Sequence, residues 1–274
     1  MPRHTSPERS AFAAIMAQPV PRMVFYYGDI DGTRALDEFD VAVIEPGHGF
    51  RPARHGRPGT LWLGYIGIGE ILETVPLFDA MPREWLIGRN GTWGGRIIDQ
   101  AAAGWPDFLV DAIASPLWRA GYRGFFLDTM DSYLLLGLNP SARARQRRGL
   151  SRAIGRLRAA FPDAVIIVNR GFELLEALGD RIDALAFESL YRGWDEARQQ
   201  YVEVPPQDRA WLLEQARAAR ACGLPVIAID YCPACEFESI PPLMKKIAAH
   251  GITPYVGDKH LMAAPTTDSW PLGP

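Results

Sequence analysis

Eight short apolar segments recur along the chain, and they constrain its fold more than any other feature. They span residues 23–27, 41–44, 61–66, 125–127, 165–168, 184–187, 226–229 and 252–256. Most are continuous apolar runs, without alternating polar positions, which is typical of strands that are covered on both faces. We therefore expect a parallel sheet whose strands are buried on both sides.

Amphipathic segments separate many of these predicted strands. Four of them, residues 106–120, 143–161, 208–222 and 241–250, carry apolar residues at helical spacing. Leu178 and Cys222 are each followed by glycine, as is common at helix ends. Strands that alternate with helices predict a parallel α/β fold, and eight such units in 274 residues predict a single (β/α)8 TIM barrel, which typically needs about 250 residues.

Two connections depart from this pattern. Residues 46–59 are too rich in proline, glycine and arginine for a helix. Residues 88–105 form a long insert between the third and fourth strands, and we expect residues 96–98 to be an extra short strand there. Long loops in compact domains are often functional. The expected division is an N-terminal extension at 1–21, the barrel at 22–263 and a C-terminal tail at 264–274.

Composition and cysteine count exclude several classes of protein. The net charge of −3 gives no reason to expect a nucleic-acid partner. No run approaches the roughly 18–20 apolar residues that span a bilayer, and the weak apolar patch at 11–17 is no clear signal peptide. Cys232 and Cys235 have CxxC spacing, but no second pair completes a zinc site. We expect a local disulfide or inert thiols there, with metal or redox chemistry as the alternative.

A polar residue, usually a carboxylate or carboxamide, follows each predicted strand. In strand order these are Asp29, Glu45, Glu70, Asp128, Asn169, Glu188, Asp230 and Asp258. In a (β/α)8 barrel all eight strand ends face the same mouth. One such carboxylate could simply cap a helix, and several could bond to Arg170, Lys259 or backbone amides. However, several of these strands lead into glycine-rich loops, and carboxylates gathered in one cleft acquire different pKa values, as acid–base catalysis requires.

Aromatic residues accompany the carboxylates, and motifs for competing chemistries are absent. Rings with a flat apolar face and a polar tip suit the C–H face of a sugar, although each ring alone could belong to the core; they are Tyr26, Tyr27, Tyr65, Trp93, Tyr133, Tyr191, Trp194, Tyr231 and Tyr255. The chain has no GxGxxG after the first strand, no P-loop, no HExxH and no GxSxG motif. We therefore predict glycoside hydrolysis, which needs two carboxyl groups.

Six short motifs carry a resemblance to a known family. In order they are YYG, IEPGH, YIGIGE, FFLDTMDSY, NRGFE and ESLYRGW, between about residues 24 and 258. The sequence resembles PelA-like glycoside hydrolase domains, which are related to glycoside hydrolase family 114, the endo-α-1,4-polygalactosaminidases. The resemblance implies a (β/α)8 barrel, no cofactor and endo-cleavage of a polysaccharide rich in α-1,4-linked galactosamine or N-acetylgalactosamine. It also implies a periplasmic or extracellular location, and Asp128 and Glu188 as the catalytic pair.

The residue pattern agrees with this pair. Asp128 ends the fourth strand and Glu188 the sixth, a separation that can bring carboxyl groups to the ~5–5.5 Å of a retaining glycosidase. We predict Asp128 as nucleophile and Glu188 as general acid/base, and the opposite assignment stays open. The surplus carboxylates favour a cationic substrate. The residues expected to bind substrate are Tyr27, Asp29, Glu45, His48, Glu70, Asp131, Tyr133, Asn169, Arg170, Tyr191, Asp230 and Tyr231.

Two other functions compete with this prediction. One is a non-catalytic barrel that binds carbohydrate, and the other is a hydrolase or transferase acting on a different α-galactosyl or amino-sugar linkage. The presence of both carboxylates argues against the first. We expect the protein to act as a monomer.

Overall fold

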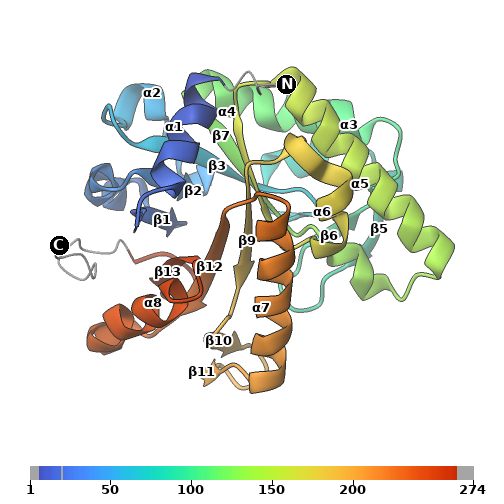
Figure 1. The fold of residues 1–274 in the computed structure, drawn as a ribbon. Helices are drawn as coiled ribbons and strands as arrows, with labels where there is room; N and C mark the ends of the chain where they lie inside the picture. The colour runs from blue at the N-terminus through green and yellow to red at the C-terminus, as the bar shows by residue number, and fades with distance from the viewer. Residues whose placement is uncertain (1–5, 20, 264–274) are drawn as a thin grey trace.

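A computed structural model describes residues 6–19 and 21–263 (Figure 1). Its eight parallel strands follow the order β1-β2-β3-β7-β8-β9-β12-β13 and form a nearly closed barrel. The bounds are β1 Met23–Tyr26, β2 Val41–Ile44, β3 Leu61–Gly67, β7 Gly124–Asp128, β8 Val165–Asn169, β9 Ala184–Glu188, β12 Val226–Tyr231 and β13 Thr253–Gly257. All eight predicted strands are confirmed, and with them the (β/α)8 barrel.

The barrel interior is filled by every second residue of the strands. Phe126 of β7 packs edge-on against Phe25 of β1, with ring centroids 5.1 Å apart. The Tyr255 hydroxyl on β13 donates a hydrogen bond of 2.9 Å to the Phe25 carbonyl, which joins the last strand to the first. Phe125 and Leu127 instead belong to the apolar layer between sheet and helices. Because side chains alternate along a strand, Asp128 points inward like Phe126.

The main helices also follow the predicted pattern. The segments predicted at 143–161, 208–222 and 241–250 are α5 Pro140–Ala160, α7 Pro206–Ala221 and α8 Ile240–Ala248. The segment at 106–120 is one continuous helical stretch, made of α3 Trp105–Phe108, a π-helical turn at Leu109–Ala114 and α4 Ser115–Ala120. A short helix, α6 Leu175–Leu178, ends before Gly179 as predicted.

The prediction for residues 46–59 was wrong in one respect. This connection contains a 3₁₀ turn at Pro46–His48 and a one-turn helix, α2 Pro52–His55. Proline is compatible with a first helical turn because the amide N–H there needs no partner within the helix. Other 3₁₀ turns lie at Ile30–Glu38, Pro76–Ala80, Arg83–Trp85, Ser132–Leu136, Phe172–Leu174, Gly179–Arg181 and Ala234–Ser239.

Two small sheets extend from the mouth of the barrel. In the connection between β3 and β7, residues 68–123, which is called the insert from here on, β4 Glu70–Ile71, β6 Arg96–Ile98 and β5 Leu86–Arg89 form an antiparallel three-stranded sheet. The insert therefore starts well before the predicted bounds of 88–105. The extra strand expected at 96–98 is confirmed, whereas β4 and β5 were not predicted. After β9 comes an unpredicted hairpin of β10 Arg192–Asp195 and β11 Gln200–Glu203. Both additions follow the carboxyl ends of barrel strands, so they add walls around the mouth.

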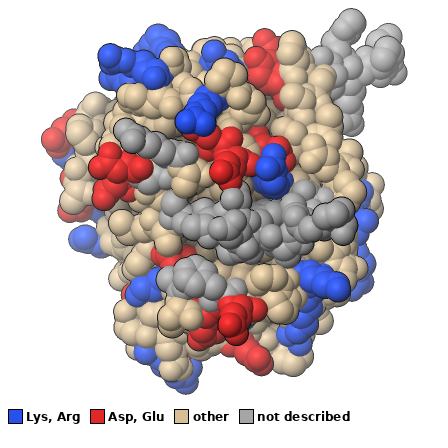
Figure 2. All heavy atoms as spheres, turned by 90° about the vertical axis from the view of Figure 1, so that its left-hand side faces the viewer, with Lys and Arg blue, Asp and Glu red and all other residues tan. Residues whose placement is uncertain are grey.

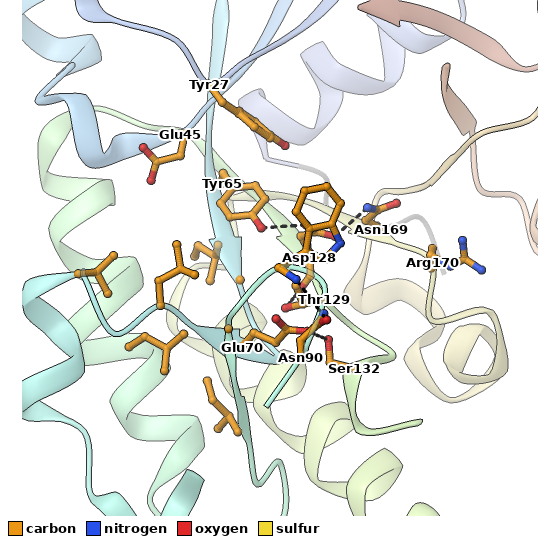
Figure 3. Close-up of a pocket in the computed structure, with 18 of the residues that line it drawn as sticks. Tyr27, Glu45, Tyr65, Glu70, Asn90, Asp128, Thr129, Ser132, Asn169 and Arg170 are labelled. Carbon is orange, nitrogen blue, oxygen red and sulfur yellow. Dashed lines mark hydrogen bonds between the residues drawn. The ribbon is translucent and has the colours of Figure 1, made fainter. Parts of the chain in front are cut away.

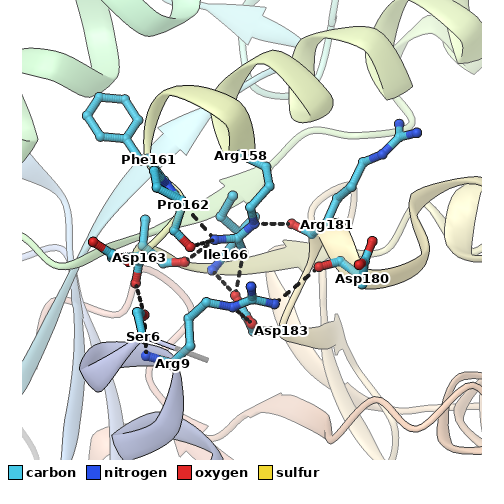
Figure 4. Close-up of polar contacts among 11 residues, drawn as sticks. Ser6, Arg9, Arg158, Phe161, Pro162, Asp163, Ile166, Asp180, Arg181 and Asp183 are labelled. Atoms are coloured by element: carbon cyan, nitrogen blue, oxygen red, sulfur yellow. Dashed lines mark hydrogen bonds and ion pairs between the residues drawn. The ribbon is translucent and has the colours of Figure 1, made fainter. Parts of the chain in front are cut away.

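The opposite end of the barrel is held by a partly buried charge network (Figure 4). Helix α1 Pro7–Met16 begins at Ser6, whose hydroxyl accepts from the Arg9 amide, and buries Phe12. Arg9 and Arg158 contact the two oxygens of Asp183 at 2.7 and 2.6 Å. Asp183 lies just before β9, at the end away from Glu188. Thus residues 7–16 of the predicted extension pack on the barrel, and the division at residues 21 and 263 stays a prediction.

Two observations concern a possible membrane or nucleic-acid partner. Within residues 6–19 and 21–263, no helix is both long and apolar enough to cross a bilayer. On the face shown in Figure 2, acidic and basic side chains lie in small interspersed groups. Such a mixture does not make the broad basic surface that binds nucleic acid.

Candidate active site

A cavity of about 660 Å³ opens at the carboxyl ends of the barrel strands. This is the end at which (β/α)8 barrels carry their sites. Nine of the predicted site residues line it: Tyr27, Glu45, Glu70, Asp128, Asp131, Asn169, Arg170, Glu188 and Tyr231. Apolar residues of β3 and of the insert continue the lining on one side, among them Ile66, Ile71, Val75, Leu77, Met81 and Ile98.

Three neighbouring strands, β7, β8 and β9, end in the residues at the centre of this cavity. Asn169 at the end of β8 donates from the same nitrogen, Nδ2, to Asp128 Oδ1 and to Glu188 Oε1, each at 2.7 Å. Two bonds of 2.7 Å to one atom keep these carboxylate oxygens within 5.4 Å of each other. The predicted pair therefore meets across the mouth, with a carboxamide between its members.

Two tyrosines hold the remaining carboxylate oxygens. The Tyr65 hydroxyl donates to Asp128 Oδ2 at 2.8 Å, and the Tyr231 hydroxyl donates to Glu188 Oε2 at 2.6 Å. Figure 3 shows Tyr65 and Asn169 reaching Asp128 from different sides. Burial, together with the charges of the two carboxylates, raises the pKa of both tyrosines well above the usual value. Both therefore stay protonated and act as donors that fix the carboxylates in place.

The electrostatic environment raises the pKa of Glu188. Burial is the main cause of this rise in pKa, followed by the charge of Asp128. The hydrogen bonds from Tyr231 and Asn169, and the charge of Arg170, lower the pKa and offset part of the rise. Because burial and a like charge both disfavour the ionised form, Glu188 keeps its proton to higher pH than an ordinary glutamate. The site thus places a carboxyl group with a raised pKa beside a second carboxyl group.

The backbone turns sharply after each central residue. Thr129, Arg170 and Ser189 directly follow Asp128, Asn169 and Glu188, and they have φ angles of 61°, 62° and 62°. Such left-handed conformations are uncommon for residues other than glycine and cost about 1 kcal/mol or more each. They recur at the ends of three adjacent strands, so the surrounding structure maintains this strain at the site.

The turn at Thr129 depends on a glycine in the insert. The Thr129 hydroxyl accepts from the Gly69 amide at 2.8 Å. A side chain at Gly69 would collide with the Thr129 carbonyl oxygen. The start of the insert is therefore attached to the residue that follows Asp128.

Further polar residues surround the central group. Glu45 lies 3.4 Å from His48 Nε2, which also contacts the Tyr27 carbonyl at 2.8 Å. Asp131 pairs with Arg170 at 3.1 Å. These contacts support the alternative that some of the predicted carboxylates pair with neighbouring basic side chains and do not bind substrate.

Five predicted substrate-binding residues do not line the cavity. Asp29 and His48 are exposed outside it, and the Tyr133 hydroxyl donates to Glu173. The Tyr191 hydroxyl pairs with His250 Nε2 at 2.6 Å, and the Lys246 ammonium lies over its ring. Their placement gives no support to a direct contact with substrate.

Asp230 is the fifth of these residues, and its place follows from the strand pleat. Tyr231 points into the barrel, so its neighbour Asp230 points outward. There the buried Asp230 carboxylate accepts from the backbone amides of Leu190, Tyr191 and Arg192, at 2.6, 2.9 and 2.9 Å. It positions the loop after Glu188 and does not face the cavity.

The structure also resolves the alternatives for cysteine. Cys222, Cys232 and Cys235 are free thiols, of which Cys232 is buried. The local disulfide is therefore not formed. Among the described residues, no group of three or more His, Cys, Asp or Glu side chains is arranged to hold a metal ion.

Several residues of the site were missing from the predicted set. Tyr65 is predicted only as one of nine aromatic residues. It lies two residues after the inward-facing Leu63, so the alternation of side chains along the strand could have placed it at the mouth. Asn90 and Ser132, which both bond to Glu70, had no recognisable signal. The left-handed backbone conformations of Thr129, Arg170 and Ser189 could not be predicted from the sequence either.

Comparisons with known proteins identify the family of the chain. A (β/α)8 barrel with two carboxyl groups paired at its mouth is an arrangement typical of glycoside hydrolases. The model of glycoside-hydrolase family GH114 matches residues 6–272, and the chain belongs to this family. The resemblance found in the sequence is thereby confirmed.

Two solved structures and one curated protein are similar to the chain. The glycoside hydrolase domain of PelA from Pseudomonas aeruginosa is 33% identical, with a TM-score of 0.81 over 88% of this chain and 96% of that domain. Aspergillus fumigatus Ega3, solved with galactosamine, shares the fold at 14% identity, with a TM-score of 0.59 over 89% and 92% of the two chains. An uncharacterized Deinococcus radiodurans protein is 29% identical over 180 residues, 57% of this chain and about half (53%) of that protein.

Proposed function

We propose that the protein is an endo-acting glycoside hydrolase that cleaves α-1,4-linked galactosamine or N-acetylgalactosamine polymers with retention of anomeric configuration. One observation carries the proposal: Asn169 holds the oxygens of Asp128 and Glu188 within 5.4 Å of each other. Retaining glycosidases keep their carboxyl groups about 5–5.5 Å apart, whereas inverting enzymes need about 6.5–9.5 Å to admit a water molecule.

The roles follow from the surroundings of each carboxyl group. Glu188, whose raised pKa keeps it protonated, donates its proton to the glycosidic oxygen as the bond to the anomeric carbon breaks. Asp128, oriented by Tyr65 and Asn169, attacks that carbon and forms a glycosyl ester. Glu188, now ionised, takes a proton from water, and the resulting attack releases the sugar and restores Asp128.

The choice of substrate rests on the family and on charge. Ega3 shares the fold and was solved with galactosamine, and PelA shares both fold and sequence. Glu45, Glu70 and Asp131 add carboxylates around the catalytic pair in the same cavity. Their negative potential favours a polymer that carries protonated amines. An extracytoplasmic location and a monomeric state stay predictions.

The direct test is cleavage of a partly deacetylated α-1,4 galactosaminan, with products analysed by mass spectrometry. We expect short oligomers from the wild type and a loss of at least about 10³-fold in kcat for Asp128→Asn and Glu188→Gln. The exposed Glu176 provides a matched control, since Glu176→Gln should leave turnover unchanged. Full turnover by both catalytic-site variants would refute the proposal, and binding without product would indicate a non-catalytic barrel.

A further inference from the structure

Trp93 is an exposed indole at the edge of the catalytic cavity. It lines the cavity and is 57% exposed. Its position is the turn between β5 and β6, the two longer strands of the insert sheet. Tryptophan is highly buried on average, and tryptophan side chains are enriched at binding interfaces.

The turn that carries Trp93 is rigidly built on Asn90. This side chain is 9% exposed, and its Oδ1 accepts from the amides of Thr92 and Trp93 at 3.0 and 3.4 Å. The Asn90 backbone closes the turn by bonding to Gly94 and Gly95, at 2.9 and 2.8 Å. The backbone position from which the indole projects is therefore set by the turn.

The same Asn90 connects this turn to Glu70. Asn90 Nδ2 donates to Glu70 Oε1 at 2.9 Å, and the Ser132 hydroxyl donates to the same oxygen. The second oxygen, Oε2, lies against Gly95, where a side chain would collide with it. Figure 3 shows Glu70, Asn90 and Ser132 grouped beside Thr129 and close to Asp128.

Glu70 has no compensating cation, unlike the neighbouring acids. Asp131 pairs with Arg170, and Glu45 lies beside His48. Across the described parts of the chain, no Lys, Arg or His nitrogen lies within ion-pair distance of Glu70. Lys259, the other cation of the cavity lining, has its ammonium 3.8 Å from the Trp194 ring centroid. One carboxylate oxygen of Glu70 is thus left for a ligand.

We propose that Trp93 and Glu70 form a subsite, next to the catalytic pair, for a pyranose unit that carries a protonated amine. The indole stacks on the C–H face of the sugar, and Glu70 Oε2 accepts a charge-assisted hydrogen bond from the ammonium group. This subsite rests on the proposed function and adds to it that the enzyme selects a deacetylated unit beside the bond it cleaves. An N-acetylated unit retains the stacking and loses the ion pair.

The test uses galactosamine and N-acetylgalactosamine oligomers of equal length, with wild type, Glu70→Gln, Trp93→Ala and Trp211→Ala. Trp211 is a matched control, because it is 45% exposed on α7 and does not line the cavity. For Glu70→Gln we expect KM for the amine oligomer to rise about tenfold, with KM for the acetylated oligomer unchanged. For Trp93→Ala we expect KM to rise for both oligomers, and for Trp211→Ala no change.

Binding measured without turnover separates this inference from the proposed function. In a Glu188→Gln background, titration calorimetry should show the same pattern of weakened binding for the Glu70 and Trp93 variants. Such a pattern supports the subsite even if the wild type cleaves neither oligomer, an outcome that would refute only the hydrolase proposal. Equal affinities for wild type, Glu70→Gln and Trp93→Ala, or no binding of the amine oligomer, would overturn the subsite.

Discussion

At the scale of single residues, Asn169 shows how the site is held together. One nitrogen reaches both carboxyl groups, while the buried side-chain oxygen has no hydrogen-bond partner in the described structure. Leaving a buried acceptor unpaired costs about 1–3 kcal/mol. The amide cannot turn over to relieve this cost, because its oxygen would then face the Asp128 carboxylate, and Nδ2 would take the position that offers no hydrogen-bond partner. The unpaired Asn169 oxygen therefore accompanies the two hydrogen bonds that limit the distance between Asp128 and Glu188.

Tyr231 offers a test of the acid assigned at the site. Its hydrogen bond lowers the pKa of Glu188, so Tyr231→Phe should raise that pKa further. If Glu188 must be protonated to act, the alkaline limb of the kcat/KM profile moves to higher pH. The profile should be recorded from pH 4 to 9 beside Tyr122→Phe, whose lost hydroxyl contacts the Phe50 carbonyl away from the cavity. A limb that stays in place or moves to lower pH would contradict the assignment.

At the scale of elements, the strand pleat decides which acids can reach a substrate. Asp128, Asn169 and Glu188 share the inward phase of their strands, whereas Asp230 is one residue out of phase with Tyr231 and serves the loop after β9. Added elements build the rest of the mouth: the insert sheet contributes Glu70 and Asn90, and both meet the loop after β7 through Ser132. At the other end, α1 and α5 are tied to the barrel through Asp183.

Helix α1 therefore should contribute to stability without contributing to catalysis. Phe12 is 1% exposed, and truncating such a residue typically costs about 3–5 kcal/mol. We expect Phe12→Ala to lower the free energy of unfolding in urea by that amount, while kcat/KM of the folded enzyme stays within about twofold of wild type. Ala13→Ser, at an exposed position of the same helix, is the control. A loss of less than about 1 kcal/mol would show that α1 is not part of the folded unit.

At the scale of the whole molecule, the two ends of the barrel use charge differently. At the α1 end, Arg9 and Arg158 neutralise Asp183 in a partly buried network. At the mouth, carboxylates outnumber the cations that lie among them, and Glu70 has no partner of opposite charge in the described structure. A cationic polymer would be drawn to this end, although the net charge of the chain is only −3.

This charge arrangement predicts a dependence on salt. The Debye length falls from about 10 Å at 0.1 M to about 3 Å at 1 M, which screens the attraction between an acidic mouth and protonated amines. We expect kcat/KM for a deacetylated polymer to decrease across this range, while that for the acetylated polymer stays nearly constant. An equal decrease for the two polymers would point to a general effect of salt on the protein and would contradict electrostatic selection.

The primary structure was sufficient for the barrel and for the meeting of Asp128 and Glu188 at its mouth, while their catalytic role stays a prediction. Continuous apolar runs separated by amphipathic segments are local patterns, and they predicted the eight strands and the main helices. The carboxyl ends of parallel strands meet at one mouth, which was enough to bring Asp128 and Glu188 together in prediction. The family motifs supplied the class of reaction, and the GH114 match over residues 6–272 confirms the family.

Long-range packing determined the rest of the site. Whether Asp230 or Tyr231 faces the cavity depends on the register of β12 against β9 and β13. The local sequence does not determine that register. Asn90, Trp93 and Ser132 reach Glu70 and the cavity only because the insert folds back on the loop after β7. Such contacts join residues far apart in the chain, and their geometry is set by the free energy of the whole packed molecule.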